Sequence, residues 1–323
     1  MPSVMAGTRR RPEHLVEKGG ALSDLNTRTP SGGDVTQRMS MKPAFSENLF
    51  EQVLLPENIQ AAWKRVRANK GAAGIDGMTI DAFPTWVRSG EWKEVVNELE
   101  TGHYYPFPVR RVEIDKPDGG KRQLGIPTVT DRVIQQAIAQ VLTPIFDPDF
   151  SDNSFGFRPN RNGQQAVKQV QGIIKTGRRF AVDVDLSKFF DRVNHDLLMT
   201  LLGYKVKDKR LLKLIKRYLR AGVIDNQLYS ESHQGVPQGG PLSPLLANIM
   251  LDPLDKELEK RGHKFARYAD DFTILVKSKR AGERVLHSIS RYLQRHLELI
   301  VNTIKSRVVK TNDSKFLGFT FRA

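Results

Sequence analysis

The segment Arg267-Tyr268-Ala269-Asp270-Asp271-Phe272 lies between two apolar runs, which indicates two strands joined by a tight turn. A second acidic motif, Asp183-Val184-Asp185, lies about 85 residues upstream. Adjacent carboxylates at a turn repel one another unless a cation lies between them. The two motifs together therefore predict a divalent metal site, and they point to phosphoryl transfer on a nucleic acid.

The composition is that of a basic, folded protein. The chain has 323 residues, of which 39% are hydrophobic, and this is enough for a packed core and more than one subdomain. Lysine and arginine number 51 against 36 aspartates and glutamates, which gives a net charge of +15. Such an excess suits a surface that follows a polyanion, but it also suits an ordinary solvated surface. Charge alone leaves both interpretations open.

Several classes of protein are excluded. The chain has no cysteine, so disulfides, thiolate catalysis and cysteine-ligated zinc are ruled out. No apolar run approaches the ~20 residues needed to cross a bilayer. The N-terminus also lacks the apolar core of a secretory signal. We therefore expect a cytoplasmic protein with no membrane partner.

The periodicity of the chain predicts a mixture of helices and strands. Residues 1–43 have no sustained period and should form a disordered basic leader. Two alternating segments within 109–127 flank a Gly-rich turn and predict a basic β-hairpin. Other strands are expected at 179–186, 264–277 (a pair) and 314–321. Helices are expected at about 57–70, 91–99, 131–146, 163–175, 194–202, 208–221, 242–262 and 281–298. We expect Pro144 to end its helix and Pro253 to kink or split its own.

The spacing of the carboxylates fits metal-assisted catalysis. Asp183 and Asp185 are two residues apart on an expected strand, so their side chains emerge on the same face. Any one of these aspartates could equally be a turn or capping residue. The joint pattern favours a polymerase site, in which two Mg²⁺ ions roughly 3.5–4 Å apart activate a primer 3′-hydroxyl and clamp a triphosphate. Mg²⁺ prefers oxygen ligands, which carboxylates, a backbone carbonyl and phosphates supply.

Six segments in a fixed order give the chain a more specific resemblance. Over roughly residues 55–321 it resembles the reverse transcriptase domain of bacterial group II intron-encoded proteins, the reverse transcriptase/maturases. The segments are the hairpin at 109–127, Ser154-Phe155-Gly156-Phe157-Arg158-Pro159, the segment with Phe189-Phe190-Asp191, Pro237-Gln238-Gly239-Gly240-Pro241-Leu242-Ser243-Pro244, Tyr268-Ala269-Asp270-Asp271 and Lys315-Phe316-Leu317-Gly318-Phe319.

The resemblance implies a set of metal ligands. Asp185 matches the first ligand because it precedes Phe190 by five positions, and Asp183 is then structural. The implied catalytic and metal-binding groups are the carboxylates of Asp185, Asp270 and Asp271 together with the backbone carbonyl of Leu186. The implied cofactor is a pair of Mg²⁺ ions, for which Mn²⁺ could substitute.

The resemblance also implies nucleotide-binding residues. Phe190 would pack under the incoming sugar and exclude a 2′-hydroxyl, while Phe189 packs in the core, because a strand can present only one of the two. Lys116 and Arg122 would bind the triphosphate, since Arg forks phosphate oxygens and Lys adds a point charge. Gln238 would lie beside the nascent base pair, and Lys305 near the triphosphate.

Template contact is implied for three further positions. Arg158 and Arg161 lie near Phe155 and Phe157 in sequence, which suggests contact with the template backbone by charge with aromatic support. Gly239 would let the backbone approach the template strand.

The fold implied is an α+β right-hand polymerase with fingers and an antiparallel palm sheet. Residues 44–180 would form mainly fingers and residues 181–323 mainly palm. The thumb expected after Lys-Phe-Leu-Gly-Phe is largely absent from the sequence, so low processivity and weak intron binding are expected.

The activity implied is RNA-directed DNA synthesis, in which a primer 3′-hydroxyl attacks a deoxynucleoside triphosphate. The partners implied are group II intron RNA, an RNA template, a DNA primer or target and dNTPs, in the service of intron retromobility and possibly splicing. One alternative is an RNA-binding maturase, a splicing cofactor with secondary catalysis. Another is a reverse transcriptase domesticated for phage defence or belonging to a retron.

Overall fold

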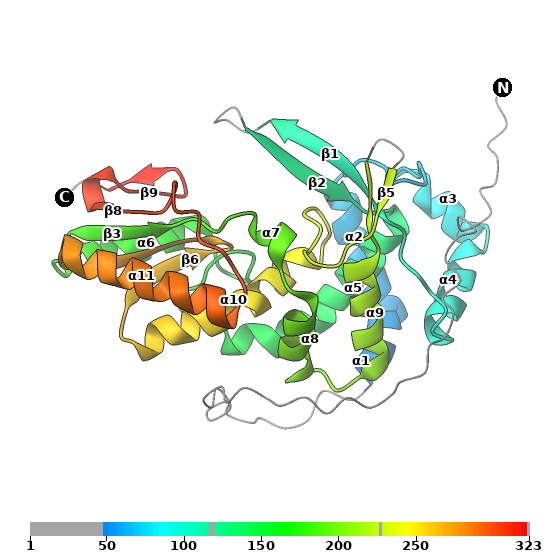
Figure 1. Ribbon diagram of the computed structural model, residues 1–323. Coiled ribbons are helices and arrows are strands. Elements are labelled where there is room, and N and C mark those ends of the chain that lie inside the picture. Colours follow the sequence, from blue (N-terminus) through cyan, green and yellow to red (C-terminus); the bar gives the residue numbers. More distant parts are fainter. Residues whose placement is uncertain (1–47, 116–119, 226–227, 322–323) are drawn as a thin grey trace, which may run out of the picture. The chain divides into compact units, whose positions relative to one another are not determined.

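The computed structural model describes residues 48–115, 120–225 and 228–321 (Figure 1). The expected leader at 1–43 and Lys116 lie outside the described residues. Contacts group Phe45–Ala323 into one compact unit. No helix in the described part of the chain is long and apolar enough to cross a membrane.

The first part of the unit is mainly helical. The long helix α5 is buried along most of its length, and the side chain of Thr128 accepts a hydrogen bond from the Asp131 amide at its start. Helix α2 packs along α5 and contributes Ala62 and Val66 to the core. The helices of this part are α1 (Leu49–Leu54), α2 (Pro56–Ala68), α3 (Phe83–Arg88), α4 (Glu91–Glu100) and α5 (Val129–Phe146), which continues into a 3-10 turn (Asp147–Asp149).

The expected basic hairpin is present as β1 (Val109–Asp115) and β2 (Lys121–Ile126). It belongs to a larger sheet of order β2-β1-β4-β5. Strand β4 (Val223–Asp225) pairs parallel with β1, and β5 (Leu228–Ser230) pairs antiparallel with β4. Sequence reasoning missed β4 and β5 because three residues are too few to show alternation.

The central sheet has the order β6-β7-β3-β8, and all its pairs are antiparallel. Its strands are β3 (Phe180–Val184), β6 (Lys264–Tyr268), β7 (Asp271–Val276) and β8 (Arg307–Lys310). Val184 of β3 lies opposite Phe272 of β7. This register brings the end of β3, followed by Asp185, to the same edge as the β6–β7 turn.

Helices cover both faces of this sheet. Alternate residues of each strand point to opposite faces, so each face has apolar side chains that a helix must cover. Val182 and Ile274 join the main core, together with Ile289 of α11. Ala181 and Leu275 join a smaller cluster with Val170 of α6. Helix α11 lies across the sheet in Figure 1. The covering and connecting helices are α6 (Gly163–Lys175), α7 (Phe189–Arg192), α8 (His195–Gly203), α9 (Lys209–Arg220), α10 (Ser243–Lys260) and α11 (Lys279–His296).

Helix α5 ends at Phe146, as expected, two residues after Pro144. The expected split of the next proline-containing helix is wrong, because α10 is one helix through Pro253, and the expected kink there stays a prediction. Leu251 and Leu254 on either side of Pro253 are fully buried. Tertiary packing of both halves of α10 therefore outweighs the lost backbone hydrogen bond.

The expected strand at 314–321 is also different in the structure. It forms a small hairpin of β9 (Lys315–Phe316) and β10 (Phe319–Thr320), preceded by a 3-10 turn (Thr311–Asp313). Leu317 and Gly318 have φ values of 52° and 81° and make the two-residue connection.

Candidate active site

The β6–β7 turn that carries Asp270 is held in place by hydrogen bonds from the Arg267 side chain. The Arg267 side chain is completely buried, and its Nη1 donates to the Ala269 carbonyl at 2.8 Å and to Asn248 Oδ1 at 2.9 Å. Its Nη2 lies 2.5 Å from Asp255 Oδ2, and Asp255 is also fully buried. Ala269 has a φ of 57°, an uncommon conformation that these contacts hold in place.

The segment around Gly156 supports the same turn from the side. The Phe155 amide donates to the Arg267 carbonyl at 2.9 Å, and Asn248 Nδ2 donates to the Gly156 carbonyl at 2.8 Å. A Cβ on Gly156 would lie 2.3 Å from the Ala269 nitrogen, so only glycine fits. Sequence reasoning missed Arg267, Asp255 and Asn248 as site-forming residues. The available signal for Arg267 was a charged residue between the apolar Phe265, Ala266 and Tyr268 in the strand, because a buried charge needs a partner.

Asp185 is positioned by the segment after α11. Its amide donates to Ser306 Oγ at 3.0 Å, and its carbonyl accepts from the Asn302 amide at 2.8 Å. Leu186 forms an isolated bridge with Val301 and is buried. Lys305 lies in this segment and is exposed. The contacts bring Asp185 and the backbone of Lys305 into the same neighbourhood.

The carboxylates interact electrostatically. Desolvation by the surrounding protein, followed by the charges of Asp270, Asp183 and Asp185, raises the pKa of Asp271 to about 6, although the Leu317 amide acts in the opposite direction. Burial also raises the pKa of Asp270, and Asp185 adds to this, while the Asp270 amide and Arg122 lower it. The shifts show that Asp183, Asp185 and Asp270 lie close enough to Asp271 to disfavour its ionisation, and that Asp185 does the same to Asp270.

The donor set fits a divalent cation. Within the described residues, no group of three or more His, Cys, Asp or Glu side chains already has the arrangement of a metal site. The mutual repulsion of Asp185, Asp270 and Asp271 is nevertheless the kind that a cation relieves, and carboxylate oxygens are the ligands that hard cations prefer.

The Asp183 carboxylate is hydrogen-bonded to side chains inside the protein. Its Oδ1 accepts hydrogen bonds from Thr273 Oγ1 at 3.0 Å and from Ser314 Oγ at 2.9 Å. These contacts tie β3 to β7 and to the segment before β9, as a structural carboxylate would.

Arg122 connects the basic hairpin to the loop before α10. Its Nε donates to Gln238 Oε1 at 2.7 Å, and the Gly125 amide donates to the Gln238 carbonyl at 2.6 Å. Gly239 has a φ of 120°, and a Cβ on it would lie 2.6 Å from the Gly125 carbonyl oxygen. The structure thus brings Arg122 and Gln238 together and places Arg122 near enough to Asp270 to lower its pKa.

Phe190 lies on α7, a short helix, and not on a strand. The expectation that strand alternation separates Phe189 from Phe190 is therefore wrong. The two rings meet edge to face at 5.1 Å, and both are buried, with Phe190 at 9% exposure and Phe189 at 2%. The Val236 amide donates to the Phe190 carbonyl at 2.6 Å, which fixes α7 against the loop that carries Gln238.

The structure corrects the expectation for Arg158. This side chain is buried, and its three nitrogens donate to Asp147 and to the carbonyls of Ser151 and Ser154. A guanidinium with all its nitrogens engaged inside the protein braces the Gly156 segment and does not face a template. Arg161 is more accessible, but it pairs with Asp152 at 2.6 Å and lies over the Phe155 ring.

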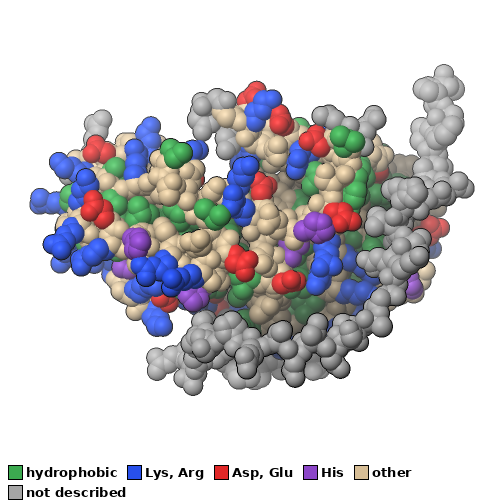
Figure 2. Space-filling view, viewed as in Figure 1, with side chains coloured by type: hydrophobic (Ala, Val, Ile, Leu, Met, Phe, Trp, Pro, Cys, Tyr) green, Lys and Arg blue, Asp and Glu red, His purple; other side chains and the backbone are tan. Residues whose placement is uncertain are grey.

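Positive charge gathers elsewhere on the surface. In Figure 2, Lys and Arg side chains cover the region where α11 lies in Figure 1. The exposed basic residues of this helix are Lys279, Arg280, Arg284, Arg291 and Arg295. This face suits a polyanion.

An antiparallel sheet that brings three aspartates together near a basic hairpin is the arrangement expected of a metal-dependent polymerase site. Residues 114–321 match the family described as reverse transcriptase (RNA-dependent DNA polymerase). The chain therefore belongs to the reverse transcriptase family, and its resemblance to group II intron reverse transcriptases is confirmed by the relatives below.

Two relatives of known name are similar to this chain in sequence. The protein YkfC of Escherichia coli is 32% identical over 315 residues, which cover 85% of this chain and 81% of that protein. The group II intron-encoded protein LtrA of Lactococcus lactis subsp. cremoris is 40% identical over 222 residues, which cover 68% of this chain but only 36% of LtrA. The chain thus matches about a third of the length of LtrA.

The similarity to a solved structure supports the fold but not the function. The apo telomerase from Candida tropicalis aligns with a TM-score of 0.51 at 14% identity, covering 66% of this chain and 47% of that one. The expected fingers–palm arrangement with an antiparallel sheet is therefore confirmed. The division into fingers at 44–180 and palm at 181–323 stays a prediction.

Proposed function

We propose that this chain catalyses RNA-templated DNA synthesis by nucleotidyl transfer onto a primer 3′-hydroxyl. The observation that carries the proposal is the meeting of Asp185, Asp270 and Asp271 at one edge of the central sheet, with Arg122 near Asp270. A triphosphate substrate requires carboxylates that hold divalent metal ions and, beside them, a positively charged side chain that binds phosphate, which Arg122 supplies here.

The three carboxylates, with the backbone carbonyl of Leu186, would hold divalent cations, for which we propose Mg²⁺ with Mn²⁺ as a possible substitute. Bound there, the cations would neutralise phosphate charge and lower the pKa of the primer hydroxyl. The protein's own contribution is to fix the ligands. Arg267 and Asp255 hold the turn with Asp270, and Ser306 and Asn302 hold Asp185.

Arg122 would bind the triphosphate, and its hydrogen bond to Gln238 orients the guanidinium. We assign Lys116 and Lys305 to the same substrate from the family resemblance. Phe190 would limit space at the sugar, and it is suited to this because α7 packs it rigidly against Phe189. Gly239 keeps the loop close to the hairpin. Arg161 is the remaining candidate for template contact.

The cellular role we propose is the copying of a group II intron RNA, with an RNA template, a DNA primer or target and dNTPs as partners. LtrA, as its name states, is encoded by such an intron. Splicing assistance is a second candidate, because another relative is the Arabidopsis nuclear intron maturase 4, 28% identical over 215 residues. The cytoplasmic location expected from the sequence stays a prediction.

Primer extension on an RNA template with Mg²⁺ and dNTPs tests the proposal. The double variant Asp270→Ala/Asp271→Ala should lose extension, and Glu283→Ala, which removes one exposed acid on α11, should retain it. Extension that survives the double variant would refute the proposed site. Splicing of a cognate intron that survives Asp270→Ala would instead assign the chain a binding role.

A further inference from the structure

Phe157 has a backbone conformation that a phenylalanine rarely adopts. Its φ is 56°, in the left-handed region, where the Cβ of an L-residue comes too close to a carbonyl oxygen. The side chain is also 58% exposed, so burial of the ring does little to offset this cost. Strained residues that persist in a folded protein cluster at functional sites. The conformation of Phe157 therefore points to a function of its side chain.

The residues on either side of Phe157 impose this conformation. Gly156 lies directly against the β6–β7 turn, where a Cβ would be 2.3 Å from the Ala269 nitrogen. The buried Arg158 guanidinium is hydrogen-bonded to Asp147 and to two backbone carbonyls. Because both neighbours are held by contacts of their own, the backbone between them cannot relax. The tertiary structure thus keeps Phe157 strained, with its ring largely exposed.

The exposed ring lies next to the candidate active site. Its centroid is 5.9 Å from the centroid of the Tyr268 ring, and the two rings are tilted by 48°. Tyr268 pairs with Asp271 across the β6–β7 turn and precedes Asp270 by two positions. Packing on Tyr268 covers only part of Phe157, since more than half of this residue stays exposed. An apolar surface therefore adjoins the turn that carries the carboxylates.

The position of this surface indicates what covers it. The proposed reaction brings the primer 3′-hydroxyl to cations held by Asp270 and Asp271, and the primer is base-paired with its template. A duplex is wider than the separation of the two rings, since the major groove of DNA alone is about 12 Å across. The paired end of the primer therefore reaches the rings as well as the carboxylates. Aromatic rings pack on nucleic acid whatever its sequence, because every base has an apolar face.

We propose that Phe157 binds the base-paired end of the primer–template duplex, by non-polar contact of its ring with the sugars and bases next to the primer 3′ end. This role rests on the proposed function, because it requires the primer to reach the carboxylates. The contact holds the duplex and takes no part in the chemical step. Loss of the ring therefore lowers the affinity for the duplex and leaves the rate of the bound complex unchanged.

The test is fluorescence anisotropy on the full chain, with a labelled DNA primer annealed to an RNA template in EDTA. Without divalent cations and dNTPs the measurement is independent of polymerase activity. Phe157→Asn removes the ring, and asparagine adopts the left-handed region readily, so the Tm should stay the same or rise. We expect the Kd for the duplex to increase about tenfold, the effect of one lost aromatic contact with nucleic acid. Phe157→Tyr keeps the ring and should bind like the parent.

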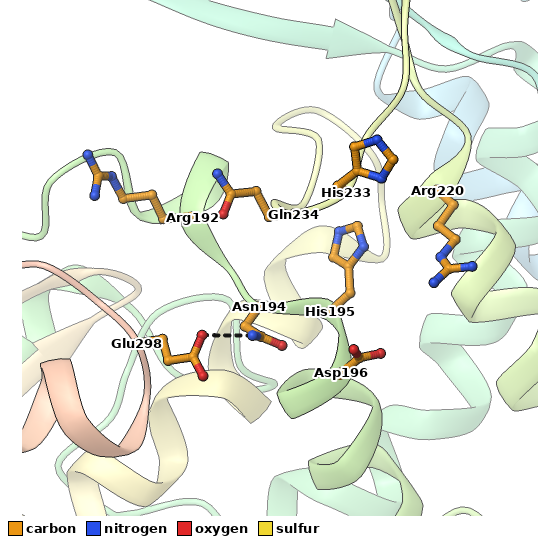
Figure 3. A pocket seen from close by; sticks show the side chains of 8 residues that line it. All are labelled: Arg192, Asn194, His195, Asp196, Arg220, His233, Gln234 and Glu298. Atoms are coloured by element: carbon orange, nitrogen blue, oxygen red, sulfur yellow. Dashed lines mark hydrogen bonds between the residues drawn. The ribbon is translucent and has the colours of Figure 1, made fainter. Parts of the chain in front are cut away.

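Glu298→Asn is the matched control. Glu298 also has a left-handed φ, of 54°, and it is exposed. It lines a polar pocket of about 230 Å³ at the start of α8, where it accepts a hydrogen bond from Asn194 Nδ2 at 2.8 Å (Figure 3). Neither Phe157 nor Tyr268 lines this pocket. The substitution relieves the same backbone strain away from the rings, so the affinity for the duplex should not change.

Primer extension with Mg²⁺ separates this role from the proposed function. Phe157→Asn should raise the KM for the duplex about tenfold at an unchanged kcat, which a general loss of folded protein would not do. A parent chain that fails to extend the primer, while its Kd still depends on Phe157, would refute the proposed function and support the contact.

Three outcomes would overturn the proposal. Equal Kd values for the parent and Phe157→Asn would show that the duplex does not touch the ring. Affinity lost equally in Phe157→Tyr would exclude contact through the ring. A lower Tm of Phe157→Asn with an unchanged Kd would assign the ring to folding instead.

Discussion

Arg267 and Asp255 form an ion pair in which both side chains are completely shielded from solvent. The same guanidinium donates to the carbonyl of Ala269, the residue before Asp270. A buried charge pair thus contacts the turn that presents the carboxylates. Because Asp255 belongs to α10 and Arg267 to β6, the packing of this helix against this strand sets the position of Asp270.

Asp255→Asn should destabilise the chain by about 3–5 kcal/mol, because it leaves the Arg267 charge buried without a counter-charge. Urea denaturation followed by circular dichroism measures this change. The double variant Asp255→Leu/Arg267→Met should recover much of the loss, since neither charge then remains. A loss below about 1 kcal/mol for Asp255→Asn would mean that water reaches Arg267.

Asp271→Asn should raise the Tm of the protein in EDTA at pH 7.5. Ionised Asp271 favours unfolding, because its pKa is about 6 in the folded protein against an ordinary value of 3.8. The penalty is absent below the ordinary value of 3.8, grows as the pH rises from there to about 6 and is complete above that. The Tm difference between variant and parent should therefore be small at pH 4 and largest above pH 6.5, and a constant difference would contradict the assigned shift.

Arg122→Ala should raise the KM for dNTPs about tenfold or more, the effect of one lost charge-assisted hydrogen bond to phosphate. Arg122→Lys should recover only part of this, because an ammonium cannot fork two oxygens. Steady-state primer extension gives both values, and Lys93→Ala on α4 is the control for net charge. Equal KM values in Arg122→Ala and the parent would remove Arg122 from the substrate site.

Gly239→Ala should destabilise the protein and reduce activity together. Its φ of 120° disfavours a side chain, and the new Cβ would lie 2.6 Å from the Gly125 carbonyl oxygen. We expect a cost of about 1–3 kcal/mol. Gly172→Ala on α6 is the matched control, because its Cβ meets open space and alanine favours a helix by about 1 kcal/mol. Similar effects of the two substitutions would argue against a close approach at Gly239.

The sequence by itself determined the family and most of the elements. The order of short motifs predicted the reverse transcriptase family, and the alternation around 109–127 and 264–277 predicted both hairpins as β1–β2 and β6–β7. These features are local, because a strand's alternation, a turn's glycines and a helix's period are set by neighbours along the chain. Where a tertiary contact could override a local rule, as at Pro253, the predicted split of the helix did not occur.

Only the tertiary structure decided which charged residues serve packing and which remain available. Arg158 and Arg122 look alike in sequence, but the first is enclosed by Asp147 and backbone carbonyls, whereas the second reaches Gln238 beside the carboxylates. Asp183 and Asp185 are likewise separated by their partners, Ser314 and Thr273 for the first and a backbone anchor at Ser306 for the second. The partner side chains lie from 11 to 131 positions away in sequence, a pairing that local pattern does not encode and that folding alone brings about.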